Sequence, residues 1–125
     1  MKISSQRKWG FTLVEIMIVV AIIGLLAAIA IPNFVRARTT AQTNACINNL
    51  RQIDGAKQQW ALENKASSVA LPVGTDIQPY MGRGSAGSLP TCPADSTKVF
   101  ATSYTIGNVS VPPVCNINGS NHVLL

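Results

Sequence analysis

The longest hydrophobic segment of the chain runs from Phe11 to Ile31. Glu15 is the one charged residue within it, and the 20 residues from Ile16 to Val35 carry no charge. A helix of about 20 apolar residues is long enough to cross the hydrocarbon core of a bilayer. The pattern therefore predicts a membrane-spanning helix near the N-terminus.

The more polar segment from Arg36 to Asn64 has no proline and is rich in Ala, Gln, Asn and Leu, so we expect the helix to continue to about Asn64. Lys57 falls on the apolar face of this segment and is an exception that the pattern does not explain. At about 100° per residue, that face is a stripe typical of a helix packed on a small domain. It is formed by Cys46, Leu50, Ile53 and Trp60.

Helical periodicity stops after Lys65, where six of the seven prolines and most of the glycines occur. Residues 72–91 are expected to form a loop that includes Ser85, Gly87 and Ser88. The rest of the chain therefore depends on strand and turn signals.

Alternating side chains predict a strand over Val99–Ile106, with one side formed by Phe100, Thr102, Tyr104 and Ile106. A two-residue hairpin turn is expected at Gly107-Asn108, before Val109 and Val111. Asn118-Gly119 is a second turn signal, and a short third strand over His122–Leu125 would end the chain. The expected fold class is α+β, with one long N-terminal α-helix packed by its second half on a small C-terminal antiparallel β-meander.

An ordinary secretory signal has a similar appearance, because Ala28, Ile29 and Ala30 before Pro32 mimic an A-x-A cleavage site. The apolar segment is, however, longer than the roughly 7–15 residues of such signals. Glu15 is also costly in an apolar segment. Both features favour a retained helix.

The net charge of +5 is concentrated before the apolar segment, at Lys2, Arg7 and Lys8. Removal of residues 1–10 leaves 5 − 3 = +2. The remaining basic residues come without a base-reading or aromatic-stacking module, so we expect a solvated helix face and no firm nucleic-acid binding. They include Arg36, Arg38, Arg51 and Lys57.

The segment RKWGFTLVEIMIVVAIIGLLAAIAIP resembles the N-terminal signature of type IV prepilins and type II secretion pseudopilins, over residues 7 to about 35. The resemblance implies a pilin-like fold. It also implies that prepilin peptidase cuts between Gly10 and Phe11 and methylates the new amino terminus of Phe11. Gly10, which has no side chain, lets an extended backbone approach a protease closely.

Glu15 needs a partner, because a carboxylate at the centre of a bilayer costs about 2.5–3.5 kcal/mol on insertion scales. Cleavage after Gly10 creates one in the α-amino group of Phe11, which is cationic near neutral pH. The resemblance implies that Glu15 pairs with the Phe11 amine of a neighbouring subunit and sets the stagger of assembly. The alternative is a protonated or headgroup-facing glutamate at the lipid interface.

Small residues at Ala21, Gly24 and Ala28 share one helix face, where other helices can approach closely. Pro32 removes a backbone hydrogen bond, so we expect a kink or local unwinding between Gly24 and Pro32. The resemblance suggests that unwinding accompanies filament assembly. Pro32 also marks the expected exit from the membrane.

The three cysteines allow three single-bridge pairings. We expect Cys92 to pair with Cys115, because both belong to the loop-rich region that would be exported into an oxidising compartment. Cys46 lies on the apolar stripe, where a thiol behaves as a small hydrophobic group.

No metal and no cofactor are predicted. A zinc site of Cys46, Cys92, Cys115 and His122 would lack a C-x-x-C pair and have wide spacing. Asp76 and Asp95 are isolated, so a calcium loop is not expected. With one histidine and no nucleophile or phosphate-loop motif, the chain is not expected to be an enzyme.

The expected organisation is a leader peptide at 1–10, a transmembrane and assembly helix at 11–35, an amphipathic continuation at 36–64 and a loop-rich β region at 65–125. The chain would be a structural subunit of a type IV pilus or type II secretion pseudopilus, anchored once in the cytoplasmic membrane with its globular end outside the cytoplasm. Its expected partners are prepilin peptidase, identical and related pilins, an inner-membrane assembly platform and, before assembly, the lipid bilayer. The alternative is a membrane-anchored binding module for DNA, a surface or a secreted substrate that does not polymerise.

Overall fold

The computed structural model describes residues 10–81 and 88–124. The expectations for leader residues 1–9, for Ser85 and Gly87, and for Leu125 fall outside the described residues. The chain divides into two compact units, Met1–Ala37 and Arg38–Leu125.

The dominant element is helix α1, Leu13–Glu63, which runs without interruption through Pro32. Its end at Glu63 confirms the prediction of a helix to about Asn64. Pro32 has no N–H to donate to the carbonyl four residues earlier, so one bond of the helical ladder is absent there. The residues around it are nevertheless helical, and local unwinding stays a prediction.

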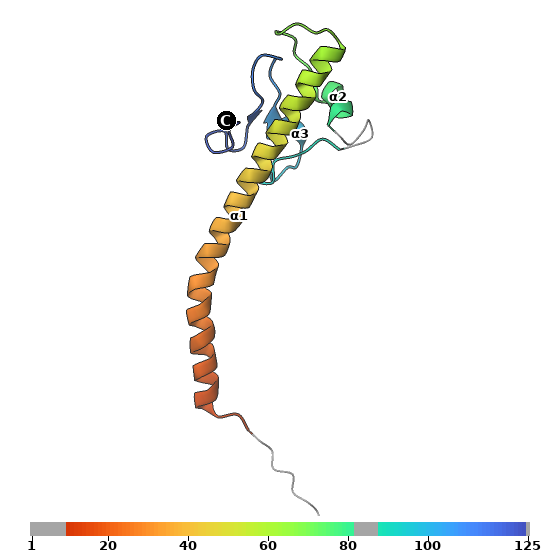
Figure 1. The fold of residues 1–125 in the computed structure, drawn as a ribbon. Coiled ribbons are helices and arrows are strands. Elements are labelled where there is room, and N and C mark those ends of the chain that lie inside the picture. The colour runs from red at the N-terminus through yellow and green to blue at the C-terminus, as the bar shows by residue number, and fades with distance from the viewer. Residues whose placement is uncertain (1–9, 82–87, 125) are drawn as a thin grey trace, which may run out of the picture. The chain divides into compact units, whose positions relative to one another are not determined.

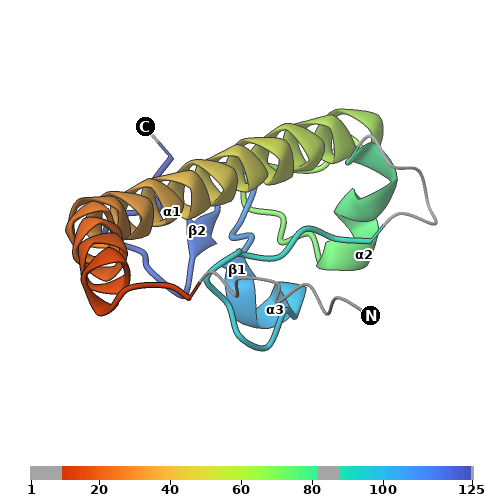
Figure 2. The ribbon, with the colours of Figure 1, turned by 90° about the horizontal axis from the view of Figure 1, so that it is seen from below.

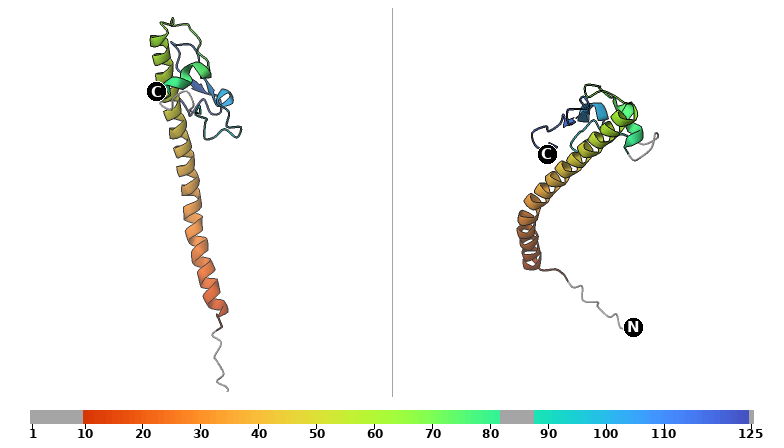
Figure 3. Two further views of the ribbon diagram at one scale, coloured as in Figure 1. Left: turned by 90° about the vertical axis from the view of Figure 1, so that its right-hand side faces the viewer. Right: turned by 45° about the horizontal axis from the view of Figure 1, so that its top comes forward.

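In the second unit, the short elements lie along the C-terminal part of α1 (Figure 1). They are helix α2 (Gly74–Ile77), the 3-10 helix η1 (Gln78–Tyr80), helix α3 (Phe100–Ser103), and strands β1 (Tyr104–Thr105) and β2 (Val114–Cys115). Seen from below in Figure 2 and from the side in the left panel of Figure 3, they cover one side of this part of the helix. The core lies between them and α1.

Strand β1 pairs with β2 in antiparallel register, with Tyr104 opposite Cys115 and Thr105 opposite Val114. This pairing turns Tyr104 and Cys115 inward and leaves the other pair exposed. Their inward side chains join the apolar face of α1 in one core. Its buried members are Cys46, Leu50, Ile53, Ala56, Ile77, Cys92, Tyr104, Ile106 and Cys115.

The α+β class, with a long helix and a small antiparallel sheet, is confirmed, but the C-terminal details differ from those expected. The sheet has two strands within the described residues, and His122–Leu124 is not a strand. The predicted loop over 72–91 contains α2 and η1.

The strand predicted over Val99–Ile106 is wrong for its first half, which forms α3. Asp95 explains the difference, because its carboxylate accepts hydrogen bonds from the hydroxyls of Thr102 and Ser103. These local bonds favour a compact turn over an extended strand.

The hairpin turn predicted at Gly107-Asn108 is also wrong, because residues 106–113 connect the two strands. Gly107 does have the positive φ of 69° that the turn signal requires. The backbone N–H of Val109, however, donates to the carbonyl of Ala70 and not to β1. The chain therefore pairs with the segment after α1 before it returns to the sheet.

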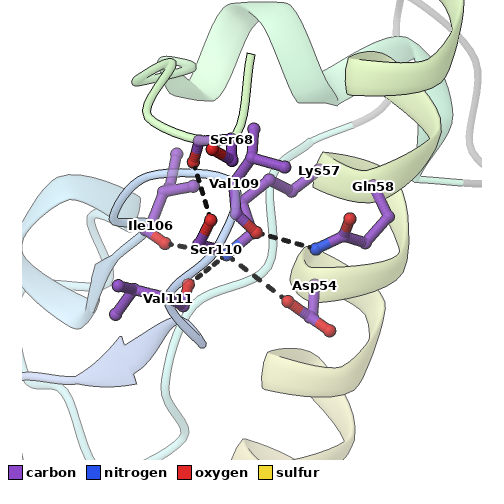
Figure 4. Close-up of polar contacts among 8 residues, drawn as sticks. All are labelled: Asp54, Lys57, Gln58, Ser68, Ile106, Val109, Ser110 and Val111. Carbon is purple, nitrogen blue, oxygen red and sulfur yellow. Dashed lines mark hydrogen bonds and ion pairs between the residues drawn. The ribbon is translucent and has the colours of Figure 1, made fainter. Parts of the chain in front are cut away.

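Lys57, the exception on the apolar stripe, is fully buried. Its ammonium group points into the connection between β1 and β2 and is surrounded there by backbone carbonyl groups (Figure 4). Gln58, the next residue, donates to the carbonyl of Val109 at 2.9 Å. Two successive residues of α1 thus fix this connection through its backbone.

Candidate functional site

The predicted cleavage point lies ahead of the first turn of α1. Gly10 and Phe11 are outside the helix and exposed, and Phe11 retains 85% of its accessible surface. A side-chain carbon placed on Gly10 would meet nothing within 4 Å. The peptide bond between the two residues is therefore open to an enzyme that requires extended backbone.

Thr12 and Glu15 form a capping box at the start of α1. The backbone N–H and the hydroxyl of Thr12 both donate to Oε2 of Glu15, each at 2.7 Å. In return, the backbone N–H of Glu15 donates to Oγ1 of Thr12 at 3.3 Å. This reciprocal pattern satisfies free donors of a helix N-terminus and stabilises the first turn.

The sequence analysis missed Thr12, although Thr-x-x-Glu before an apolar segment is a known signature of a helix start. Through this contact, the Glu15 carboxylate already has donors within its own chain. It is held at the start of the helix, near the predicted new amino terminus at Phe11.

The apolar part of α1 has no protein cover. Every large hydrophobic side chain from Phe11 to Val35 is exposed, with exposed fractions between 49% and 85%. Ala21, Gly24 and Ala28, the residues expected to pack against other helices, are exposed as well. By length and composition, α1 is the one helix of the described residues that is able to cross a membrane.

The structure brings together Cys92 and Cys115, the two cysteines expected to form a disulfide. Cys115 lies on β2 and Cys92 precedes α3, and both are buried as free thiols. Cys46 from α1 and His122 from the C-terminal turn lie in the same cluster. Burial raises the pKa of the Cys46 thiol to about 12. The expected disulfide is not formed in the structure and stays a prediction.

The comparisons with known proteins bear first on the N-terminal segment. The family model described as the prokaryotic N-terminal methylation motif matches residues 8–31. The chain carries this methylation motif. The match covers the Gly10–Phe11 bond, Glu15 and most of the exposed apolar segment.

Curated relatives of two kinds are similar to the chain. The type IV major pilin protein PilA of Myxococcus xanthus is 42% identical over 71 residues, which are 56% of this chain and 32% of that protein. The type II secretion system core protein G of Klebsiella pneumoniae is 37% identical over 59 residues, 47% of this chain and 42% of the relative. The type IV major fimbrial protein FimA of Dichelobacter nodosus is 33% identical over 97 residues, 78% of this chain and 62% of the relative.

These similarities confirm the resemblance to type IV pilins and pseudopilins. The matches span between 32% and 62% of the length of those relatives. In the comparison with solved structures, none matches. The similarity to PilA and to protein G is thus confined to about half of the chain.

Proposed function

We propose that the chain is a structural subunit of a type IV pilus or a type II secretion pseudopilus. Prepilin peptidase would cut it between Gly10 and Phe11 and methylate the new amino group. The supporting observation is that the methylation motif of residues 8–31 overlaps the first part of α1, where every large hydrophobic side chain from Leu13 to Val35 is exposed.

Such an apolar surface requires either lipid or other helices around it, because exposure to water is unfavourable by about 25 cal/mol per Å². Before assembly, the bilayer of the cytoplasmic membrane would cover the segment. In the filament, the helices of identical or related pilins would replace the lipid, with close approach at Ala21, Gly24 and Ala28. An inner-membrane assembly platform would couple the two states, and the globular end would lie outside the cytoplasm.

Glu15 would guide the incoming subunit. Its carboxylate, oriented by Thr12, would pair with the Phe11 amine of a neighbouring subunit, since an unpaired charge is costly among apolar helices. This contact would set the stagger between subunits. The role is structural, and no catalytic step is assigned to the chain.

The test combines two measurements on the protein in its native host. N-terminal sequencing and intact mass of the membrane-associated chain should show a start at methylated Phe11. The Glu15→Ala variant should remain in the membrane fraction but give few or no filaments by electron microscopy. Glu63→Ala, the same substitution at the other end of α1, is the matched control and should assemble normally.

Two results would overturn the proposal. A start at Ile31 would identify the segment as an ordinary secretory signal. Normal cleavage at Phe11, with no filaments from the unmodified chain, would instead support an anchored binding module for DNA, a surface or a secreted substrate.

A further inference from the structure

Four side chains with metal-binding atoms meet in the core of the second unit, although the sequence analysis predicted no metal there. Each comes from a different part of the chain: helix α1, the segment before α3, strand β2 and the C-terminal turn. They are almost fully buried, with exposed fractions of 0%, 1%, 3% and 3%. In that order, they are Cys46, Cys92, Cys115 and His122.

The four atoms are close enough together to hold one ion, and two of the distances between them match tetrahedral coordination. The three sulfur atoms and a ring nitrogen of His122 all lie within 4.8 Å of one another. Nδ1 of His122 is 3.5 Å from Sγ of Cys115 and 3.7 Å from Sγ of Cys92. Zinc with Zn–S bonds of about 2.3 Å and Zn–N bonds of about 2.0–2.1 Å would place tetrahedral ligands about 3.5–3.8 Å apart.

The second nitrogen of His122 has the partner that a metal-binding histidine requires. Nε2 lies 3.3 Å from Oγ1 of Thr43 on α1. With Nε2 protonated and donating to that hydroxyl, Nδ1 is left with a free lone pair directed toward the sulfur atoms. A hydrogen bond from the outer nitrogen is the usual way in which proteins fix the tautomer of a histidine ligand.

The sulfur of Cys46 has a donor of its own. The hydroxyl of Tyr104 donates to Sγ of Cys46 at 3.5 Å, and it accepts a hydrogen bond from Nδ2 of Asn49 at 3.0 Å. Because Asn49 supplies the proton on one side, the single proton of Tyr104 is free to point at the sulfur. A donor placed in this way stabilises a negatively charged thiolate.

A disulfide alone accounts for less of this arrangement. One bridge between Cys92 and Cys115 would use two of the four groups and would leave the sulfur of Cys46 and Nδ1 of His122 buried beside it without a part in the covalent bond. A metal ion uses all four groups. Three sulfurs and one imidazole nitrogen in tetrahedral arrangement are a ligand set that Zn²⁺ prefers, and four buried protein ligands leave no open position for substrate.

We propose that Cys46, Cys92, Cys115 and His122 bind one Zn²⁺ ion as a structural Cys₃His site. The ion would join α1 to the loop, to the sheet and to the C-terminal turn of the second unit. Binding converts three neutral thiols and one neutral imidazole into three thiolates and a coordinated imidazole. Three protons are therefore released for each Zn²⁺ bound, and no oxidant or reductant takes part.

The test uses the full chain, solubilised in detergent and kept reduced, with Co²⁺ and Zn²⁺ as the probes. Co²⁺ should bind one ion per chain and give the thiolate charge-transfer band and the intense visible bands of tetrahedral coordination. Zn²⁺ should abolish these bands and should release three protons per ion in weakly buffered solution. Native mass spectrometry should show one zinc per chain.

Variants separate the ligands from their supporting residues. Cys115→Ser and His122→Ala should each weaken Zn²⁺ binding by more than about 100-fold, since each removes a ligand. Tyr104→Phe and Thr43→Val keep all four ligands and should weaken binding by about 10- to 100-fold, as is typical for second-layer hydrogen bonds. Tyr104→Phe should also shift the charge-transfer band, which mere loss of packing would not do. Ser110→Ala, which alters a surface loop contact of the same unit, should bind like the unmodified chain.

Three results would overturn the proposal. The first is failure of the reduced chain to bind Co²⁺ or Zn²⁺ at stoichiometric concentration. The second is binding of Co²⁺ to His122→Ala with unchanged bands and affinity. The third is a chain that, when isolated from its host, contains no metal and is two hydrogen atoms lighter than the reduced form, as a Cys92–Cys115 disulfide requires.

Discussion

The ammonium nitrogen of buried Lys57 lies 3.3 Å from the carbonyl oxygen of Ile106. It also donates to the carbonyl of Val111 and lies 3.4 Å from Oδ1 of Asp54 (Figure 4). Ile106 and Val111 both lie in the connection between β1 and β2, which is not part of the sheet. A cation on the apolar face of α1 thus supplies hydrogen bonds that the sheet does not.

Replacement of Lys57 by Met should destabilise the second unit. Met preserves most of the buried aliphatic volume but leaves the carbonyls of Ile106 and Val111 without their donor. Ile106 is buried, whereas Val111 is 49% exposed. One unsatisfied buried carbonyl costs about 1–3 kcal/mol, so we expect the free energy of unfolding to fall by about 1–3 kcal/mol. Urea unfolding of the detergent-solubilised chain, followed by near-ultraviolet circular dichroism, measures the change.

The neighbouring substitution Gln58→Ala is the control for Lys57→Met. Gln58 donates to the carbonyl of Val109 from an exposed position. Water can replace its hydrogen bond, so the loss should stay within about 1 kcal/mol. An equal effect of the two substitutions would show that burial of the ammonium group is not what matters.

Asp95 should make the second unit sensitive to acid. Its carboxylate accepts hydrogen bonds from Thr97, Thr102 and Ser103, and these bonds lower the pKa of Asp95 below its usual value. In the unfolded chain, the pKa of the Asp95 carboxyl is near 3.9, so the unfolded chain binds the proton more readily than the folded chain. The resulting stability is present above that value and should decline as pH falls below about 5.

The Asp95→Asn variant tests this assignment. It should have a lower urea midpoint at pH 7 and a smaller further loss between pH 5 and pH 3 than the unmodified chain. Both should be measured in the presence of a chelator, so that acid release of metal does not contribute. Asp76→Asn, at a half-buried turn whose carboxylate accepts from the N–H of Val73, is the matched control. An unchanged pH dependence in Asp95→Asn would contradict the assignment.

Two glycines should respond to alanine in opposite directions. Gly107 has φ of 69°, a conformation that costs an L-residue about 1–2 kcal/mol, while the nearest atom to an added Cβ is at an ordinary 3.6 Å. Gly55 lies in α1 with nothing within 4 Å of an added Cβ. Gly107→Ala should therefore lower the free energy of unfolding by about 1 kcal/mol. Gly55→Ala should raise it by about 0.5–1 kcal/mol. Destabilisation by both would mean that crowding, not backbone conformation, decides the outcome.

The long helix was predictable from the sequence because its signals are local and repeated. The uncharged segment, the absence of proline from Arg36 to Asn64 and the apolar stripe at Cys46, Leu50 and Ile53 all indicate a helix, and α1 ends within one residue of the expected Asn64. The stripe also predicted the correct core face, since these three side chains are fully buried.

The C-terminal region was less predictable because its strands are only two residues long. The alternation of Phe100, Thr102, Tyr104 and Ile106 resembles a strand, but Asp95 draws the first part into a helical turn. The hydrogen bonds of Asp95 with Thr102 and Ser103 produce no periodic pattern in the sequence. The alternating pattern therefore gave the wrong prediction where side-chain hydrogen bonds, and not pairing in the sheet, determine the backbone conformation.

The cluster of cysteines and His122 was not predictable from spacing. Cys46 and His122 are 76 positions apart in the sequence, and no C-x-x-C pair marks the site. Its members meet because the apolar stripe of α1 and the inward side of the sheet share one core. The apolar stripe correctly predicted that Cys46 lies among buried hydrophobic residues, but it did not indicate that the thiol lies beside other side chains able to bind a metal.

The capping box separates two roles of Glu15. Thr12→Ala removes the hydroxyl that donates to the carboxylate and accepts from its N–H. Loss of a Thr cap costs about 1 kcal/mol, so the amides of the first turn should exchange with deuterium several-fold faster. The carboxylate itself remains. If Glu15 acts through the amine of a neighbouring subunit, Thr12→Ala should slow assembly but still give filaments, whereas Glu15→Ala should give few or none.

Thr12→Ser is the matched control, because it restores the hydroxyl and should restore both the exchange rate and the rate of assembly. Filament counts and hydrogen exchange should be measured on the same membrane preparations, with leader cleavage checked by mass. Loss of filaments in Thr12→Ala equal to that in Glu15→Ala, with normal cleavage, would mean that helix capping and not pairing between subunits is the contribution of Glu15. In that case, the amine of Phe11 would need another partner in the filament.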